Sequence, residues 1–144
     1  PRDFIFLLLL AALILSVIVA QYHFVYELKT WTEARSYCRE KYTDLATIDN
    51  MEDMNTLNSM VDLSKMRAWI GLYDDLDSWR WSLSNKGFYK QGETEFRRWA
   101  EGEPNNKDST EHCTVMVQTG LWADVPCEST SEMVCMDVKG ENIN

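Results

Sequence analysis

The sequence predicts a single exported α+β domain, and three observations support this. An apolar leader at the amino terminus directs the chain to an oxidising compartment, where its four cysteines can form disulfides. Two segments of helical periodicity come first, and several short β-type segments follow them. Without the leader, roughly 120 of the 144 residues remain, an ordinary size for one domain.

The leader covers residues 1–20. Arg2 precedes an almost unbroken apolar run that ends in the small residue Ala20, as in a secretory signal peptide. The run is just short of the roughly 20 residues that a membrane-spanning helix needs, so a short plasma-membrane anchor is the alternative. Because the chain begins with Pro1 and not Met, we expect the leader to be incomplete. Both interpretations place residues 21–137 outside the cell, with a polar tail or linker over 138–144.

A strand and a helix are expected directly after the leader. Tyr22, Phe24 and Tyr26 alternate with other residues, which is the period of a half-buried strand. Thr30 and Glu33 form a capping-box pattern, and the apolar residues that follow at helical spacing include Cys38.

A second helix and the β-type segments complete the predicted fold. Asn50 opens the helix, whose apolar side carries Met54, Leu57 and Val61. Short β-type runs then lie at 68–72, 79–81, 113–117, 121–122 and 133–136. The stretch over 84–112 is rich in glycine and polar residues and longer than a compact domain carries without a functional reason, so the functional site is expected there.

The four cysteines at positions 38, 113, 127 and 135 predict two disulfides. Three pairings are possible, and the spacing alone does not choose among them. The absence of a C-x-x-C pair, with only His23 and His112 as histidines, argues against structural zinc.

The net charge of −9 argues against nucleic acid as a partner, because phosphate binding needs clustered Lys and Arg. The chain also lacks a G-x-S-x-G elbow, an H-E-x-x-H helix and a glycine-rich phosphate loop. We therefore expect a binding module and not an enzyme.

Four oxygen-bearing side chains in and after the long stretch are candidate ligands of a hard cation: Glu103, Asn105, Glu111 and Asp124. Calcium takes six to eight such oxygens at about 2.3–2.6 Å and tolerates the irregular geometry that loops offer. The nearest acidic cluster, which includes Asp74, lacks the spacing of an EF-hand loop.

Taken in order, these motifs resemble the C-type lectin domain over residues 22–137. They are the Trp69–Leu72 segment with Gly71, the Glu103–Pro104–Asn105 triplet, Glu111 just before Cys113, and the 121–127 segment with Trp122. The resemblance implies a double-loop α+β fold with two helices, two small antiparallel sheets and a long calcium-binding loop. It also implies the disulfides Cys38–Cys135 and Cys113–Cys127.

By the same resemblance, one Ca²⁺ is held by Glu103, Asn105, Glu111 and Asp124, and these residues also contact the sugar. The Glu-Pro-Asn triplet implies mannose, fucose or N-acetylglucosamine, as in mannose-binding lectins and macrophage mannose receptor-like proteins, and Pro104 is expected to be cis. The implied partners are glycans or glycoproteins in innate immune recognition. A homo-oligomer or a multidomain receptor is expected because single lectin sites bind weakly.

One position departs from the family pattern. Ala123 stands where sugar-binding members have an asparagine that ligates calcium and donates to a hydroxyl. Losing such an interaction costs about 1.5–3 kcal/mol, so calcium and sugar affinity are expected to be reduced. The rival hypothesis is a lectin-like domain that binds a protein or another non-sugar ligand without calcium.

Overall fold

The computed structural model describes residues 19–60, 67–75, 78–83, 95–117 and 120–139. Most of the predicted leader, Val61, part of the long stretch over 84–112 and the end of the tail lie outside these residues. The elements in chain order are β1 (Val19–Lys29), α2 (Trp31–Lys41), β2 (Asp44–Leu45), α3 (Met51–Met60), β3 (Ala68–Asp75), β4 (Ser78–Trp81), the 3-10 turn η3 (Lys107–Ser109), β5 (Cys113–Met116), β6 (Trp122–Val125) and β7 (Ser131–Lys139).

The strands form one mixed sheet in the order β1-β7-β3-β5-β6, with β2 added to β7 and β4 to β3. The predicted α+β class is confirmed. The two antiparallel groups of strands expected as separate sheets are joined here, because β3 runs parallel to β7 where Ala68 faces Glu132 and Trp69 faces Met133. The antiparallel β1–β7 ladder places Val19 opposite Lys139, so both ends of the domain leave at the same place.

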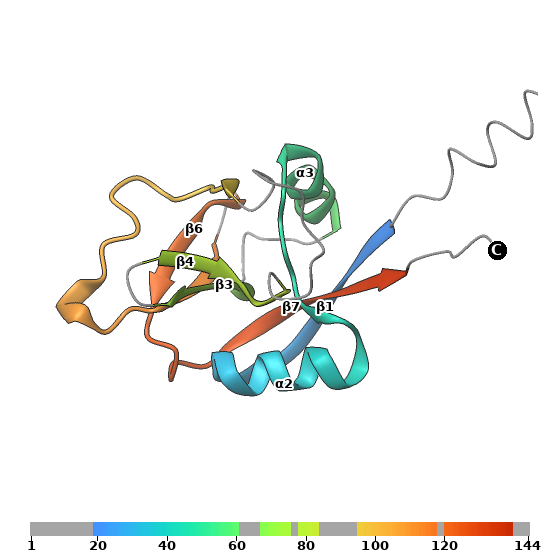
Figure 1. Ribbon diagram of the computed structural model, residues 1–144, viewed down its shortest axis with the longest axis horizontal. Coiled ribbons are helices and arrows are strands. Elements are labelled where there is room, and N and C mark those ends of the chain that lie inside the picture. The colour runs from blue at the N-terminus through green and yellow to red at the C-terminus, as the bar shows by residue number, and fades with distance from the viewer. Residues whose placement is uncertain (1–18, 61–66, 76–77, 84–94, 118–119, 140–144) are drawn as a thin grey trace, which may run out of the picture.

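Both predicted helix starts are confirmed. The Thr30 hydroxyl accepts a hydrogen bond from the Glu33 N–H at 3.3 Å, and the Asn50 side chain accepts one from the Asp53 N–H at 2.9 Å. Each cap satisfies a backbone donor that the first helical turn leaves unpaired. The helices α2 and α3 lie on opposite sides of the β1–β7 ladder (Figure 1).

The core therefore has two parts. One cluster contains Met54 and Leu57 of α3 with Trp81 and Trp122, and the other contains residues of α2 with Trp69. Trp69, Trp81 and Trp122 are fully buried, as expected for core aromatics. The Trp69 indole N–H donates to the Lys29 carbonyl at 2.7 Å, so its polar atom is satisfied inside the protein.

Two disulfides fasten the sheet at different places, Cys38–Cys135 and Cys113–Cys127, and this is the pairing that the family resemblance implies. The first connects α2 to β7 across 97 residues, and the second closes 14 residues around β5 and β6. In the loop-entropy model these bridges stabilise the fold by about 4.7 and about 3 kcal/mol.

Gly71 makes the closest backbone approach in this core. Its N–H donates to the Ala46 carbonyl at 2.9 Å, and a Cβ at this position would lie 3.0 Å from that oxygen.

We expect Gly71→Ala to lower the free energy of unfolding by about 1–3 kcal/mol, because the buried backbone has to move. Urea unfolding measures the loss. Gly102→Ala is the comparison for a conformational cost alone, because a Cβ there would meet nothing within 4 Å and only the positive φ opposes it, at about 1–2 kcal/mol. A loss of less than about 0.5 kcal/mol in Gly71→Ala would contradict the close-approach explanation.

Candidate functional site

The candidate site lies at the end of the molecule away from the carboxy-terminal end of the chain, in the segment drawn yellow to orange in Figure 1. Two backbone hydrogen bonds fasten the start of this segment to β6: Ala100 N–H donates to Trp122 and Trp122 N–H donates to Arg98, each at 2.8 Å. The loop that carries the candidate ligands therefore leaves from a fixed edge of the sheet.

The turn at Pro104 brings two candidate ligands together. The Glu103–Pro104 peptide bond is cis, as the resemblance implies. The Asn105 amide group donates to the Glu103 carboxylate at 3.0 Å. Consequently, the acid and the amide of the triplet present their polar groups at one place on the surface.

Asp124 of β6 accepts hydrogen bonds from the same turn. It lies in β6 with only 2% of its surface exposed. One of its carboxylate oxygens accepts the Asn105 N–H at 3.0 Å, and the other accepts the Asn106 N–H at 2.7 Å. Two backbone donors thus share one buried carboxylate, which sets the distance between the sheet and the turn.

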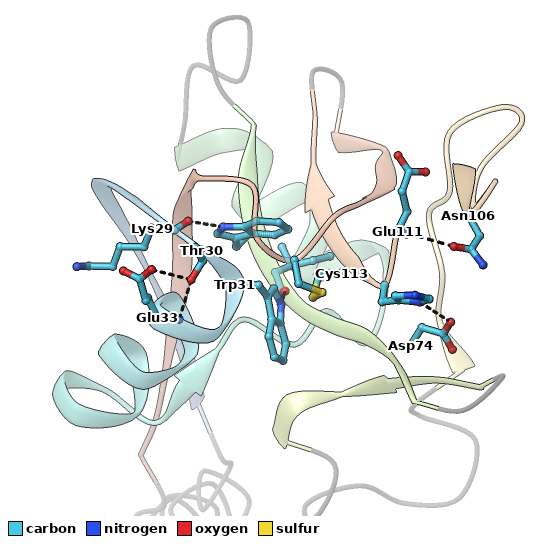
Figure 2. Close-up of a disulfide and its surroundings, with 12 residues drawn as sticks. Lys29, Thr30, Trp31, Glu33, Asp74, Asn106, Glu111 and Cys113 are labelled. Carbon is cyan, nitrogen blue, oxygen red and sulfur yellow. Dashed lines mark hydrogen bonds and ion pairs between the residues drawn. A yellow bond between two sulfur atoms is a disulfide. The ribbon is translucent and has the colours of Figure 1, made fainter. Parts of the chain in front are cut away.

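Glu111 is connected to the other ligands through a backbone amide. The Lys107 N–H donates to the Glu111 carboxylate at 3.0 Å and to the Asn105 side-chain oxygen at 3.1 Å. The Glu111 N–H in turn donates to the Asn106 side chain at 3.1 Å, a bond that Figure 2 shows as a dashed line.

The four predicted ligands thus share one hydrogen-bonded network. Asn105 bonds directly to Glu103 and Asp124, and the Lys107 N–H connects Asn105 to Glu111. In the part of the chain that the structure describes, no three Asp, Glu, His or Cys side chains converge as a metal site requires. A cation here would therefore depend on the amide oxygen of Asn105.

The electrostatics of Glu103 test whether a cation fits. A hydrogen bond with the Asp124 carboxyl raises the pKa of Glu103 to about 7, and partial burial and the like charges of Asp124 and Glu111 act in the same direction. The four predicted ligands offer only oxygen atoms, the ligand atoms that calcium prefers, so the chemistry of the donor set fits this ion.

Ala123 occupies a partly exposed position in β6. It faces Val115 across the β5–β6 ladder and packs at the edge of the cluster that contains Trp69. Its methyl group supplies no oxygen to the loop. The space beside it is partly open to solvent, so a larger side chain can be tolerated there.

Two features of the site were not anticipated from sequence. The exposed His112 ring lies 3.2 Å from the Asp74 carboxylate and 3.1 Å from the Ser109 carbonyl. Figure 2 shows the Asp74 contact. Asn106, with φ of 44°, accepts the Glu111 N–H, and its only sequence signal is that Asn tolerates left-handed backbone.

A disulfide-bonded α+β domain with an oxygen-rich loop at one end of its sheet is a binding module of the C-type lectin-like class. The chain belongs to the C-type lectin domain family, because the family model for the lectin C-type domain matches residues 27–137. Members of this family are binding proteins, which confirms that the chain is not an enzyme.

Relatives and solved structures agree with this assignment. The chain is 37% identical to E-selectin and 33% identical to L-selectin, both from Bos taurus, over 79% of its length, and it covers 24% and 31% of those proteins. It also matches the cow CD23 carbohydrate-recognition domain, solved in the presence of a GlcNAc2Man3 oligosaccharide, with a TM-score of 0.70 and 26% identity. That match covers 83% of this chain and 88% of the other. The expected likeness to mannose-binding lectins and macrophage mannose receptors stays a prediction.

No helix in the described ranges is both long and apolar enough to span a membrane.

The raised Glu103 pKa predicts how the stability of the ion-free domain varies with pH. The folded state holds a proton with a pKa of about 7, whereas the usual value is 4.5, so this group stabilises the fold below the usual value and ceases to do so as the pH rises through about 7. We expect metal-free protein to lose stability between pH 5 and pH 8, and Glu103→Gln to remove part of that loss. Thermal unfolding of both proteins checks this, and identical pH profiles would exclude the assigned cause.

Proposed function

We propose that this domain binds carbohydrate in a calcium-dependent manner, with mannose-type specificity. The observation that carries the proposal is the turn at Pro104, in which the Asn105 amide group donates to the Glu103 carboxylate and the Asn105 N–H donates to Asp124 of the sheet. An acid and an amide held side by side can accept from and donate to neighbouring hydroxyl groups.

We assign one calcium ion to Glu103, Asn105, Glu111 and Asp124. All four supply oxygen, the ligand atom that calcium prefers. The ion would supply coordination for two neighbouring sugar hydroxyls, which complete its ligand shell. The hydrogen bond between Glu103 and Asp124 supports this assignment, as does the Lys107 N–H, which bonds to both Asn105 and Glu111.

The sugar class rests on the order of acid and amide in the triplet. Glu-Pro-Asn is the family pattern for mannose, fucose and N-acetylglucosamine, whereas Gln-Pro-Asp is the pattern for galactose. The mannose-containing oligosaccharide present with the CD23 domain is in accord with this choice. The similarity to selectins does not by itself select a sugar.

The setting follows from the positions of the site and the chain ends. We place the domain outside the cell, where its disulfides persist, as a secreted protein or on the plasma membrane through its apolar leader. Since the chain ends leave the sheet at the side away from the loop, the loop faces outward toward glycans or glycoproteins (Figure 1). Clustering of sites, as an oligomer or among further domains, would raise avidity by about 10²–10⁴.

A glycan array probed with and without chelator tests the proposed function. We expect mannose-type signal in calcium that chelator abolishes, because the hydroxyls need the ion. The matched variant is Glu103→Gln with Asn105→Asp, which exchanges acid and amide at nearly constant shape and should transfer the signal to galactose. A blank array would instead favour the rival function, recognition of a protein or other non-sugar ligand without calcium, and a sugar signal that survives chelator would contradict the calcium dependence.

Restoring an asparagine tests the role of position 123. We expect Ala123→Asn to tighten calcium binding by about ten- to a hundredfold, the equivalent of one hydrogen bond or ligand to a charged group. Isothermal titration with calcium measures this. Ala123→Ser is the control, since its short hydroxyl adds polarity with less reach. Unchanged calcium affinity in Ala123→Asn would show that Ala123 does not weaken the site.

A further inference from the structure

The end of β1 carries the two most exposed large apolar side chains in the described part of the chain. Tyr26 is 69% exposed and Leu28 is 65% exposed, whereas Tyr22 and Val25 of the same strand are buried. Single exposed apolar residues are common on protein surfaces. Two that lie two positions apart in one strand form a small patch, and such patches mark contact surfaces.

A bulge separates this segment from the rest of the sheet. Val25 and Lys29 pair with β7, but the three residues between them, 26–28, have no partner there. β1 is also the first strand in the order β1-β7-β3-β5-β6, so no other described strand covers its outer edge. An uncovered edge presents backbone donors and acceptors to a further strand.

The backbone at Leu28 is directed toward this open edge. The Lys29 carbonyl accepts the Trp69 indole N–H at 2.7 Å, so it points into the protein. Because successive residues of a strand direct their backbone groups to opposite edges, we expect the Leu28 N–H and C=O at the outer edge. There they can bond to the same two groups of a second Leu28, as in the hydrogen-bonded pair of an antiparallel ladder.

The charges beside Leu28 are complementary in that arrangement. The Glu27 carboxylate and the Lys29 ammonium group lie on one face of the strand, 3.8 Å apart. With a two-fold axis at Leu28, Glu27 of each copy lies opposite Lys29 of the other. On the other face, Leu28 lies opposite Leu28, and Tyr26 is its diagonal neighbour. Opposite charges across a ladder stabilise the pairing, whereas like charges destabilise it.

We infer that residues 26–29 form a self-complementary contact through which two copies of this chain associate edge to edge. A second copy is the partner that the charge order favours, because a uniformly acidic or basic strand would place like charges opposite Glu27 or Lys29. The inference goes beyond the proposed function, since the contact involves none of the candidate calcium ligands and needs neither ion nor sugar.

The length of the contact sets its strength. The chain turns into α2 at Trp31, so the paired segment is short and the association is weak and transient. The net charge of −9 also opposes self-association. Tethering of several copies to one surface or assembly would raise their effective concentration and make a weak contact sufficient.

Sedimentation velocity of the purified protein tests this inference, in EDTA to exclude calcium and at about 0.15 M salt, where the Debye length is about 8 Å. We expect a dimer whose fraction rises with concentration. Glu27→Lys and Lys29→Glu each place like charges opposite one another, so each alone should weaken dimerisation about tenfold or more. Glu27→Lys does so although it makes the net charge less negative. The matched control is Glu40→Lys, the same charge change on the exposed side of α2, which should not weaken the dimer.

Mixing the two variants gives the sharper test. An equimolar mixture of Glu27→Lys and Lys29→Glu should form a mixed dimer, because only the mixed pair has opposite charges at both positions. The double variant Glu27→Lys with Lys29→Glu should dimerise with itself for the same reason. Tyr26→Ser with Leu28→Ser keeps the charges but removes the apolar contact, so it should be monomeric. Urea unfolding reports whether each variant is folded.

The outcomes also separate this inference from the proposed function. A wild-type protein that stays monomeric at its highest soluble concentration would overturn the inference and leave calcium-dependent sugar binding untouched. A dimer that survives both single charge variants, or a mixture that associates no better than either variant alone, would overturn it too. A dimer with these charge effects, together with a blank glycan array, would support the inference and contradict the proposed function.

Discussion

The pairing of β7 with its neighbours is the constraint on which the rest of the structure depends. β7 is antiparallel to β1 and β2, parallel to β3, and bonded through Cys135 to α2. This single strand therefore brings the two ends of the domain together and separates the two core clusters. Residues 101–112 are left at the other end of the sheet, where irregular chain can be exposed without opening the core.

The loop at that end is organised by polar contacts and not by burial. Residues 104–110 are all exposed, and their geometry comes from hydrogen bonds to Asp124, Asn105 and Asn106. The same region holds three carboxyl groups, and the pKa of Glu103 is raised by its hydrogen bond to Asp124, by partial burial and by the like charges of Asp124 and Glu111. A stable fold gains nothing from such crowding, so the arrangement is best understood as binding chemistry placed on a rigid support.

Ala123 and Asp124 are neighbours in sequence with different consequences for recognition. The Ala123 methyl group offers no hydrogen-bonding atom to the loop, whereas the Asp124 carboxylate accepts two backbone amides of the turn.

The sequence by itself determined the class of fold, the helix starts at Thr30 and Asn50, the strand segments and the four oxygen-bearing candidates, because these depend on local periodicity, capping chemistry and motif spacing. It did not determine the short parallel contact of β3 with β7, the partners of His112, or the route by which Asp124 reaches two amides of the turn nearly twenty positions earlier. Those features depend on how distant segments approach one another, and only tertiary packing decides that distance. The position of the Glu103–Pro104–Asn105 triplet also depends on the buried Asp124 carboxylate of β6, which accepts the Asn105 and Asn106 amides, and no local sequence pattern encodes that contact.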